Sequence, residues 1–402
     1  MTTQEYMQGD KEIFAHLLKY VSAETYTRDR PLDLETDEAL LRLQPILCEY
    51  FSRDELIELV GEGTASKILN LYHIEILQNV FLEYELQQVL HAFNEASIPL
   101  MLFKGPVLAY TIYPKPHLRT YHDLDAFIHP DDVPRAHELL LRMGYAFYNE
   151  YRVDAIDKQR TGYHFSRQHP GSPFTVIIEL HTAPHGSEIG TPFEREALWK
   201  NANAMTVLGQ PTITMSSVDH LLYLCWHYRF HGFTRLLWLY DLVMMLRFYG
   251  DLLDWTSLIK TARRQQLAAT LYYCLSWCHQ LFGVAIPPRV LTSLRPPLGS
   301  RLIVERIALT DVARALSVDR YQEQRLIARR AMVDTNIGLL KAGLRMLFPS
   351  PIALQKRYLD HSRLPLQLFF LFYFIHPWRT LTRGCRKLFS DRGKAQQRKE
   401  IS

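Results

Sequence analysis

The spacing of apolar residues changes twice along this chain, and these changes constrain its fold more than any single motif. From residue 10 to 97, apolar residues recur every three or four positions, which predicts amphipathic helices. A Ser-Ile-Pro sequence at 97–99 ends this pattern, and residues 98–185 carry short apolar runs of strand length. Helical spacing returns from Ser216 onward. The sequence therefore predicts an α+β fold, with a small mixed sheet between N-terminal and C-terminal helical regions.

The length and the composition of the chain are compatible with a folded protein of several domains. The chain has 402 residues, of which 48% are hydrophobic and 22% are charged, as in globular proteins that bury a sizeable core. We expect an N-terminal helical region over 1–97 and an α/β domain over 98–210. A helical domain over 211–350 and a C-terminal segment over 351–402 complete the predicted division.

The net charge of +4 is unevenly distributed. Residues 379–402 hold eight Lys/Arg and two acids, a balance of +6, so the remainder of the chain carries 4 − 6 = −2. A slightly acidic body argues against extensive nucleic-acid binding, which needs a basic surface. The apolar run Leu368–Ile375 is far shorter than the roughly 20 residues that cross a bilayer. It suits a buried helix or an interfacial anchor, and the basic residues after it suit weak contact with an anionic membrane or a macromolecule.

The N-terminus and the cysteines indicate the compartment. The first residues, MTTQEYMQGDKEIF, lack the basic and apolar regions of a secretory signal. Five cysteines are scattered along the chain, and the i,i+4 pair Cys274 and Cys278 lies in an apolar helical run that suits core packing better than a metal site. We therefore expect a reduced, cytoplasmic protein that is at most peripheral to a membrane.

Two aspartates in the strand-like run HDLDAFIHP point to chemistry. Asp123 and Asp125 are two residues apart, so they project from the same face of a strand. Two carboxylates held so close repel each other unless a cation lies between them, and Mg²⁺ prefers such oxygen ligands. Glu179, in the run FTVIIELHT, supplies a third acid if its strand lies beside the first. The three acids predict a site for Mg²⁺, with two ions, that serves nucleotidyl or phosphoryl transfer.

Basic residues upstream of the aspartates suit a phosphate group. The turn at Lys104 and Gly105 combines a cation with backbone amides at the start of a helix. Arg119 is predicted either to contact a phosphate oxygen or to form a salt bridge with one of the aspartates. His181 either orients Glu179 or packs in the core.

These motifs together resemble a known family. The stretch LFKGPVLAYTIYPKPHLRTYHDLDAFI is similar to the core of the uncharacterised nucleotidyltransferase family, within the DNA polymerase beta-like superfamily. The family pattern is a Lys-Gly turn, a short helix, an Arg, an Asp-x-Asp strand and a later acid-x-His strand, matched here by Glu179 and His181. A helical His-x3-His-x3-Arg-x5-Asp pattern follows, and its matches are His227, His231, Arg235 and Asp241. The resemblance covers about residues 85–250.

The resemblance implies a Mg²⁺-dependent nucleotidyltransferase. It implies metal ligation by Asp123, Asp125 and Glu179, and a nucleotide contact at Lys104-Gly105. The transferred group would be an NMP, most simply AMP from ATP, and the acceptor a hydroxyl of a small molecule, peptide or protein rather than a nucleic acid. Two alternatives remain: a phosphotransferase that uses the same acids, and a non-catalytic nucleotide-binding or scaffold protein.

The later helical motif permits two interpretations. His227 and His231 are four residues apart on one helical face, but the Glu of a zinc-protease helix is missing after the first His. Structural histidines are one interpretation, with Asp241 paired to Arg235 or to a histidine. A contact with the nucleotide base or the acceptor is the other.

Overall fold

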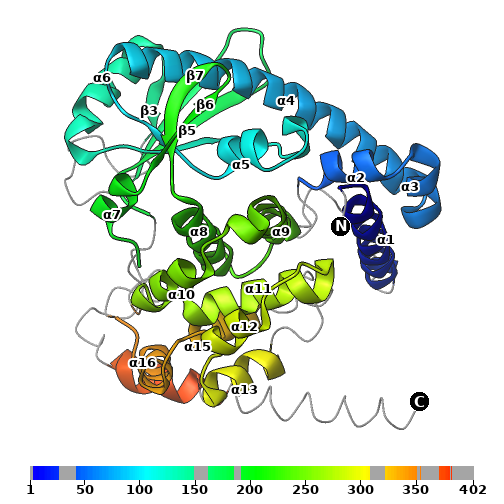
Figure 1. Ribbon diagram of the computed structural model, residues 1–402, viewed down its shortest axis with the longest axis vertical. Coiled ribbons are helices and arrows are strands. Elements are labelled where there is room, and N and C mark those ends of the chain that lie inside the picture. Colours follow the sequence, from blue (N-terminus) through cyan, green and yellow to red (C-terminus); the bar gives the residue numbers. More distant parts are fainter. Residues whose placement is uncertain are drawn as a thin grey trace.

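A mixed sheet lies at one end of the molecule, with helices across both of its faces (Figure 1). The computed structural model describes residues 3–26, 42–148, 162–184, 192–307, 322–350, 354, 371–380 and 382. Within them the strand order is β3-β4-β5-β2-β1-β7-β6. The strands are β1 (Met101–Leu102), β2 (Leu124–Phe127), β3 (Ala146–Tyr148), β4 (Gly162–Gln168), β5 (Thr175–His181), β6 (Asn203–Val207) and β7 (Gln210–Thr214). The predicted α+β fold with a mixed sheet is confirmed.

Two parallel pairings make the sheet mixed. β2 is parallel to β5, and β1 is parallel to β7, whereas the other neighbours are antiparallel. The hairpin of β6 and β7 was not predicted from the sequence. It turns at Leu208 and Gly209, both with positive φ, and its second strand runs past residue 210 to Thr214. The sheet thus continues beyond the boundary that the sequence suggested for the α/β domain.

Long and short helices cover the face of the sheet shown uppermost in Figure 1. The helix α4 (Glu62–Glu95) has 34 residues and extends across this face beside α6 (Val133–Arg142). Leu124 and Ala126 of β2 belong to the apolar cluster formed here. Besides α6, the helices that connect the strands along the chain are α5 (Gly105–Thr111), η1 (Pro116–Leu118), η2 (Pro130–Asp132) and α7 (Arg195–Lys200).

The other face of the sheet looks toward a helical body. Phe127 of β2 belongs to the cluster that includes α8 (Ser217–Phe230) and α9 (Leu236–Tyr249), so alternation along the strand points Asp125 to the same side. Below α8 and α9 lie the remaining helices (Figure 1). They are η3 (Gly250–Leu252), α10 (Trp255–Arg264), α11 (Ala268–Phe282), α12 (Pro288–Leu294), α13 (Leu298–Ile307), α15 (Gln322–Ala331) and α16 (Asn336–Leu347).

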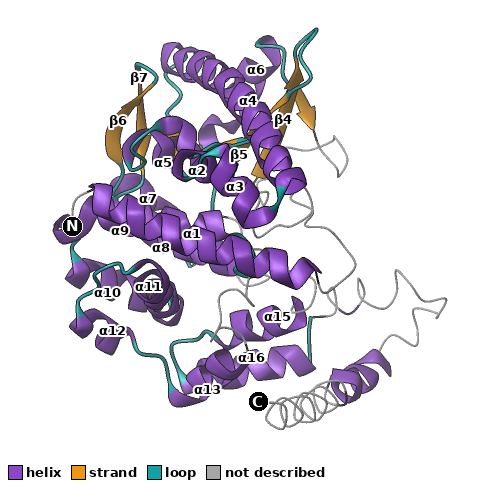
Figure 2. Cartoon of the chain, turned by 90° about the vertical axis from the view of Figure 1, so that its right-hand side faces the viewer, coloured by secondary structure: helices purple, strands orange, loops and turns teal. Residues whose placement is uncertain are grey.

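The N-terminal helices join this same body. They are α1 (Thr3–Tyr26), α2 (Gln44–Tyr50) and α3 (Arg53–Val60), and α1 lies in front of the helical body in Figure 2. Asp10 of α1 is buried and accepts hydrogen bonds from Tyr240 (2.7 Å) and Arg247 (2.6 and 2.9 Å) of α9. The beginning and the middle of the chain therefore share one core, and the predicted division into domains stays a prediction.

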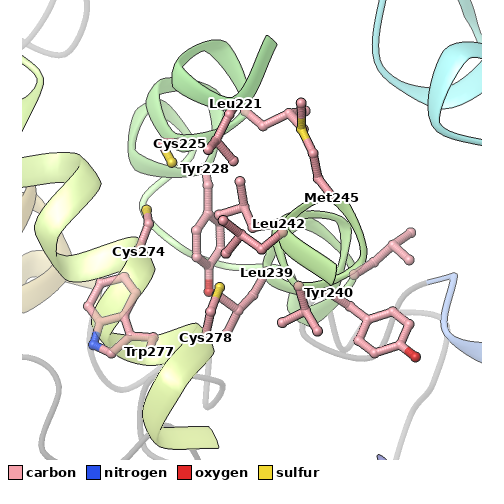
Figure 3. Close-up of a cluster of buried hydrophobic side chains, with 14 of the residues drawn as sticks. Leu221, Cys225, Tyr228, Leu239, Tyr240, Leu242, Met245, Cys274, Trp277 and Cys278 are labelled. Atoms are coloured by element: carbon pink, nitrogen blue, oxygen red, sulfur yellow. The ribbon is translucent and has the colours of Figure 1, made fainter. Parts of the chain in front are cut away.

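The predicted packing of the cysteines is confirmed in the helical body. Cys274 and Cys278 of α11 lie with Cys225 of α8 among aromatic and aliphatic side chains (Figure 3). All three are buried, and burial raises the pKa values of the Cys274 and Cys278 thiols well above their usual range. These thiols are core residues.

The predicted C-terminal helix is partly within the described residues. Of the apolar run Leu368–Ile375, the last five residues belong to a helical segment over 371–380, and the first three lie outside the described residues. So does the basic tail beyond residue 382. None of the helices in the described ranges has the length and hydropathy needed to cross a membrane.

Candidate active site

Asp125, Glu179 and His181 meet where β2 and β5 run side by side. The register of this parallel pair places Asp125 beside Glu179 and Phe127 beside His181. Because alternate residues of a strand share a face, Asp125, Glu179 and His181 all face the helical body. Their ligand atoms lie within 4.8 Å of one another. The pairing of strands that the sequence argument required is present. Asp123, which directly precedes β2, stands outside this group of three.

His181 and Lys104 hold Asp125 from two sides. The Nε2 atom of His181 is 2.9 Å from Oδ1 of Asp125 and 3.5 Å from Oε2 of Glu179. The ammonium of Lys104 is 2.9 Å from Oδ2 of Asp125. A ring N–H of His181 thus lies between the two acids, and a lysine balances the more buried one. The sequence argument left His181 between packing and orientation, and its contacts support orientation of both acids.

The turn at Lys104 and Gly105 has a constrained backbone. Lys104 has φ +57° and ψ −129°, outside the regions that residues with a side chain prefer, and such strain costs about 1–3 kcal/mol. Its N–H donates to Nε2 of His220 (3.4 Å), and its carbonyl accepts the N–H of Leu108 at the start of α5. A Cβ at Gly105 would lie 2.6 Å from Cβ of Tyr121, so this position has room only for glycine. The turn is therefore built to point the lysine at Asp125.

One face of α8 supports the same lysine. His220, Tyr223 and His227 are spaced i, i+3 and i+7, so they lie on one side of the helix. The Tyr223 hydroxyl is hydrogen-bonded to Lys104, and His220 accepts the backbone bond described above. Burial lowers the pKa of His220 to about 4, which keeps its ring neutral and able to accept. The helical spacing of these three residues was the available signal, but only His227 was singled out from the sequence, in its pair with His231.

The charges of the site are interdependent. Burial favours the neutral form of Asp125, but the Lys104 ammonium and the His181 hydrogen bond outweigh it, so the pKa of Asp125 is lowered. Burial, followed by the negative charge of Asp125, raises the pKa of Asp123. For Glu179, hydrogen bonds from His164 and His181 outweigh burial and lower the pKa. The protein thus supplies its own positive charge to two ionised acids.

The predicted phosphate contact of Arg119 is replaced by a buried ion pair. Its guanidinium donates to Oδ1 (2.6 Å) and Oδ2 (2.9 Å) of Asp241 and to the carbonyl of Thr120 (2.6 Å). Tyr113 donates to the same carboxylate at 2.8 Å. Arg119 and Asp241 are 4% and 0% exposed, so neither contacts solvent to any extent. The prediction that Asp241 pairs with Arg235 or a histidine is therefore wrong, and Arg119 anchors the loop before β2 onto α9.

A different arginine lies beside the acids. Arg42, which precedes α2, is half-buried and interacts electrostatically with Asp123 and Glu75. Neither an ion pair nor a hydrogen bond of its guanidinium occurs within the described residues. Burial lowers the pKa of Arg42, and the neighbouring charges of Arg235 and Arg119 add to this effect. Nothing in the local sequence marks Arg42, because it lies some eighty residues before Asp123.

The two histidines of the helical motif pack against aromatic rings. The ring of His227 is 4.6 Å from that of His231 and 4.6 Å from that of Trp238, measured between centroids. It also stacks on Tyr223 at 6.2 Å. Burial and the charge of Lys104 hold the pKa of His227 well below its usual range, so it is neutral. The described residues bring no carboxylate or thiol together with these rings as a metal site. The structural interpretation of His227 has direct support.

The donor set fits a hard divalent cation. Asp125 and Glu179 offer carboxylate oxygens on one face, and Asp123 adds a third carboxylate next to them. His181 already bridges the two acids through Nε2, the position from which it would orient them around an ion. The ammonium of Lys104 partly neutralises the negative charge of this cluster through its ion pair with Asp125. Carboxylates, a lysine and a buried histidine in this arrangement suit the binding of a phosphorylated substrate together with Mg²⁺.

Comparison with known proteins assigns the chain to a family. Residues 40–283 match the family described as uncharacterised nucleotidyltransferase. This match spans more than half of the chain, so the chain belongs to that family. Among solved structures, an antigenic nucleotidyltransferase-like protein from Paracoccidioides brasiliensis is similar at 12% identity, with a TM-score of 0.32, over 53% of this chain and 92% of that chain. No protein with a curated description matches.

Proposed function

We propose that this protein transfers an NMP group, most simply AMP from ATP, to a hydroxyl of a small molecule, peptide or protein. The observation that carries the proposal is the convergence of Asp125, Glu179 and His181, with Lys104 against Asp125, in a member of a nucleotidyltransferase family. The acceptor oxygen would attack the α-phosphorus, and the bond from that phosphorus to the bridging oxygen would break. Pyrophosphate would leave, and a carboxylate of the site would take the hydroxyl proton.

The roles of the side chains follow from their contacts. Asp125, Glu179 and Asp123 would hold Mg²⁺, which neutralises phosphate charge and polarises the attacking hydroxyl when bound. His181 keeps the first two acids at a fixed separation through its Nε2 atom. Lys104, held by Tyr223 and by its strained turn, contributes a positive charge for a phosphate oxygen.

Arg42 takes the phosphate contact that the sequence suggested for Arg119. It interacts electrostatically with Asp123, its guanidinium has no hydrogen bond or close ion pair among the described residues, and it is only half-buried. A guanidinium in such a place gains most from a ligand with phosphate oxygens, because a charge-assisted hydrogen bond contributes about 1.5–3 kcal/mol. Replacing Arg42 by alanine would therefore raise KM for the nucleotide by about tenfold or more. Arg53→Ala is the matched control, since Arg53 is exposed on α3.

Labelled nucleotides test the reaction. The full-length protein is incubated with Mg²⁺, α-labelled NTPs and candidate acceptors, and covalent label on the acceptor is measured. Transfer of α-label that Asp125→Asn abolishes, and that the exposed control Asp131→Asn retains, is the expected result. Transfer of γ-label in its place would establish a phosphotransferase. Nucleotide binding without any transfer would favour the non-catalytic alternative, and transfer that survives Asp123→Asn plus Asp125→Asn would refute the metal assignment.

A further inference from the structure

Helices near the C-terminus expose an apolar surface far from the candidate active site. On α16, Ile337, Leu340 and Leu344 are 67%, 65% and 49% exposed, and their spacing of i, i+3 and i+7 puts them in one stripe. The stripe points outward because the opposite side of α16 packs inward, where Leu339 approaches Gly299 of α13. An exposed apolar stripe on a helix that already packs by its other side indicates a binding surface.

The helical segment 371–380 repeats this arrangement. Its Phe372 and His376 are buried, and His376 lies 3.1 Å from the carbonyl of Met346 at the end of α16. The other side carries Leu371, Phe374, Ile375 and Trp378 at i, i+3, i+4 and i+7, and Phe374 and Trp378 are 74% and 70% exposed. The hydrogen bond places this segment beside α16, so the two stripes belong to one region, which we call the C-terminal apolar surface. Leu298 and Leu302 of the adjoining α13 are exposed as well.

The charged residues of α16 and of segment 371–380 are all basic. Lys341 and Arg345 are exposed on α16, and Arg379 follows Trp378. Neither α16 nor segment 371–380 contains an acid, and residues 379–402 have a sequence charge of +6. Apolar stripes, a terminal Trp and flanking Lys/Arg together match an anionic lipid surface, whose headgroups attract the basic residues while the apolar side chains enter the boundary with the acyl chains.

The geometry favours binding on the membrane surface. A helix of 12 residues is about 18 Å long, well short of the roughly 30 Å hydrocarbon layer. Figures 1 and 2 place α13 and α16 at the end of the molecule opposite the sheet. We propose that the C-terminal apolar surface binds an anionic membrane and leaves the sheet, with Asp125 and Glu179, at the far end of the molecule. This proposal does not depend on the proposed reaction.

Vesicle binding by the full-length protein tests the proposal. Vesicles of phosphatidylcholine alone are compared with vesicles that also contain phosphatidylglycerol, by co-sedimentation at low and high salt. We expect binding to the anionic vesicles that weakens at high salt. Leu340→Ser with Leu344→Ser, and separately Phe374→Ser with Trp378→Ser, should each lower the partition coefficient about tenfold or more, since these side chains would be buried in lipid. The matched control is Leu77→Ser with Val80→Ser on α4, where both residues are also exposed.

The outcomes separate this proposal from its competitors. Thermal unfolding and circular dichroism of the variants should match the wild type, because the replaced side chains are exposed. Absence of binding to anionic vesicles, or equal loss of binding in the α4 control, would overturn the proposal. Sedimentation equilibrium provides a second check: a dimer that the Leu340 and Leu344 variant dissociates would assign the surface to self-association and also overturn it.

Discussion

The buried pair of Arg119 and Asp241 makes the sharpest prediction about stability. Asp241 is 0% exposed and accepts two hydrogen bonds from Arg119 and one from Tyr113. Asp241→Asn keeps the shape but removes the charge that balances the guanidinium. An uncompensated buried charge costs about 3–5 kcal/mol. Because the amide oxygen of Asn can still accept a hydrogen bond, we expect a loss near the lower end, about 3 kcal/mol.

The double variant measures the pairwise interaction. Arg119→Met leaves the buried Asp241 carboxyl with Tyr113 as its remaining donor and should cost at least as much as Asp241→Asn. Arg119→Met combined with Asp241→Leu removes both charges and fills the space with apolar atoms. The matching single variant Asp241→Leu, which should cost at least as much as Asp241→Asn, completes the cycle. We expect the double variant to lie within about 2 kcal/mol of the wild type, which corresponds to a coupling free energy of about 4 kcal/mol or more.

Urea unfolding at 25 °C, monitored by circular dichroism, gives these free energies. A double variant whose loss equals the sum of the single losses would refute the pairing, since independent sites are additive. Nucleotide kinetics add a second criterion. If Arg119→Met raised KM for ATP and left stability unchanged, Arg119 would contact phosphate and its assignment as an anchor of the loop would be wrong.

Three further predictions concern the backbone, pH and the N-terminal helix. Gly105→Ala brings a Cβ within 2.6 Å of Tyr121 and should lower the free energy of unfolding by about 1–3 kcal/mol together with transfer activity; unchanged values would contradict the close approach. The pKa of His220 falls from 6.5 to about 4 on folding, so the unfolded chain binds more protons between these values and stability decreases as pH falls. From pH 7 to pH 5 this group should remove about 2 kcal/mol, and His220→Asn should flatten that part of the stability profile measured by urea unfolding. Asp10→Ala deprives a buried arginine of its counterion and should cost about 3 kcal/mol, measurable as a lower urea midpoint; a loss below about 1 kcal/mol would contradict the assigned contact.

Local patterns predicted the elements that carry the site. The Lys-Gly turn, the short helix after it and the strands around Asp125 and Glu179 are all present, because each has its own apolar period and its own turn residues. The hairpin of β6 and β7 has a weaker signal, since most of its residues are exposed or half-buried and its pairing to β1 crosses a hundred residues. The spacing of apolar residues alone cannot identify a strand whose pairing partner is distant in the chain.

Charge partners escaped sequence reasoning more than elements did. Asp125 and Glu179 were predicted to meet because both lie in apolar strands, where an acid needs a counter-charge. The counter-charges themselves come from elsewhere: Lys104 and His181 in the sheet region, and Arg42 before α2. Arg119 looked equally suitable in sequence, yet packing placed it against Asp241 on α9.

The amino-acid sequence was enough to predict most of the helices and strands, including the strands that hold Asp125 and Glu179, and the turn at Lys104 and Gly105. These features depend on local periodicity and on contacts between near neighbours. Which cation balances which acid, and which way the apolar residues of α16 point, follow only from the packing of the folded chain. Those outcomes depend on distances between segments far apart in the chain. Burial sets their energies, because it removes more water from Arg119 than from the half-buried Arg42.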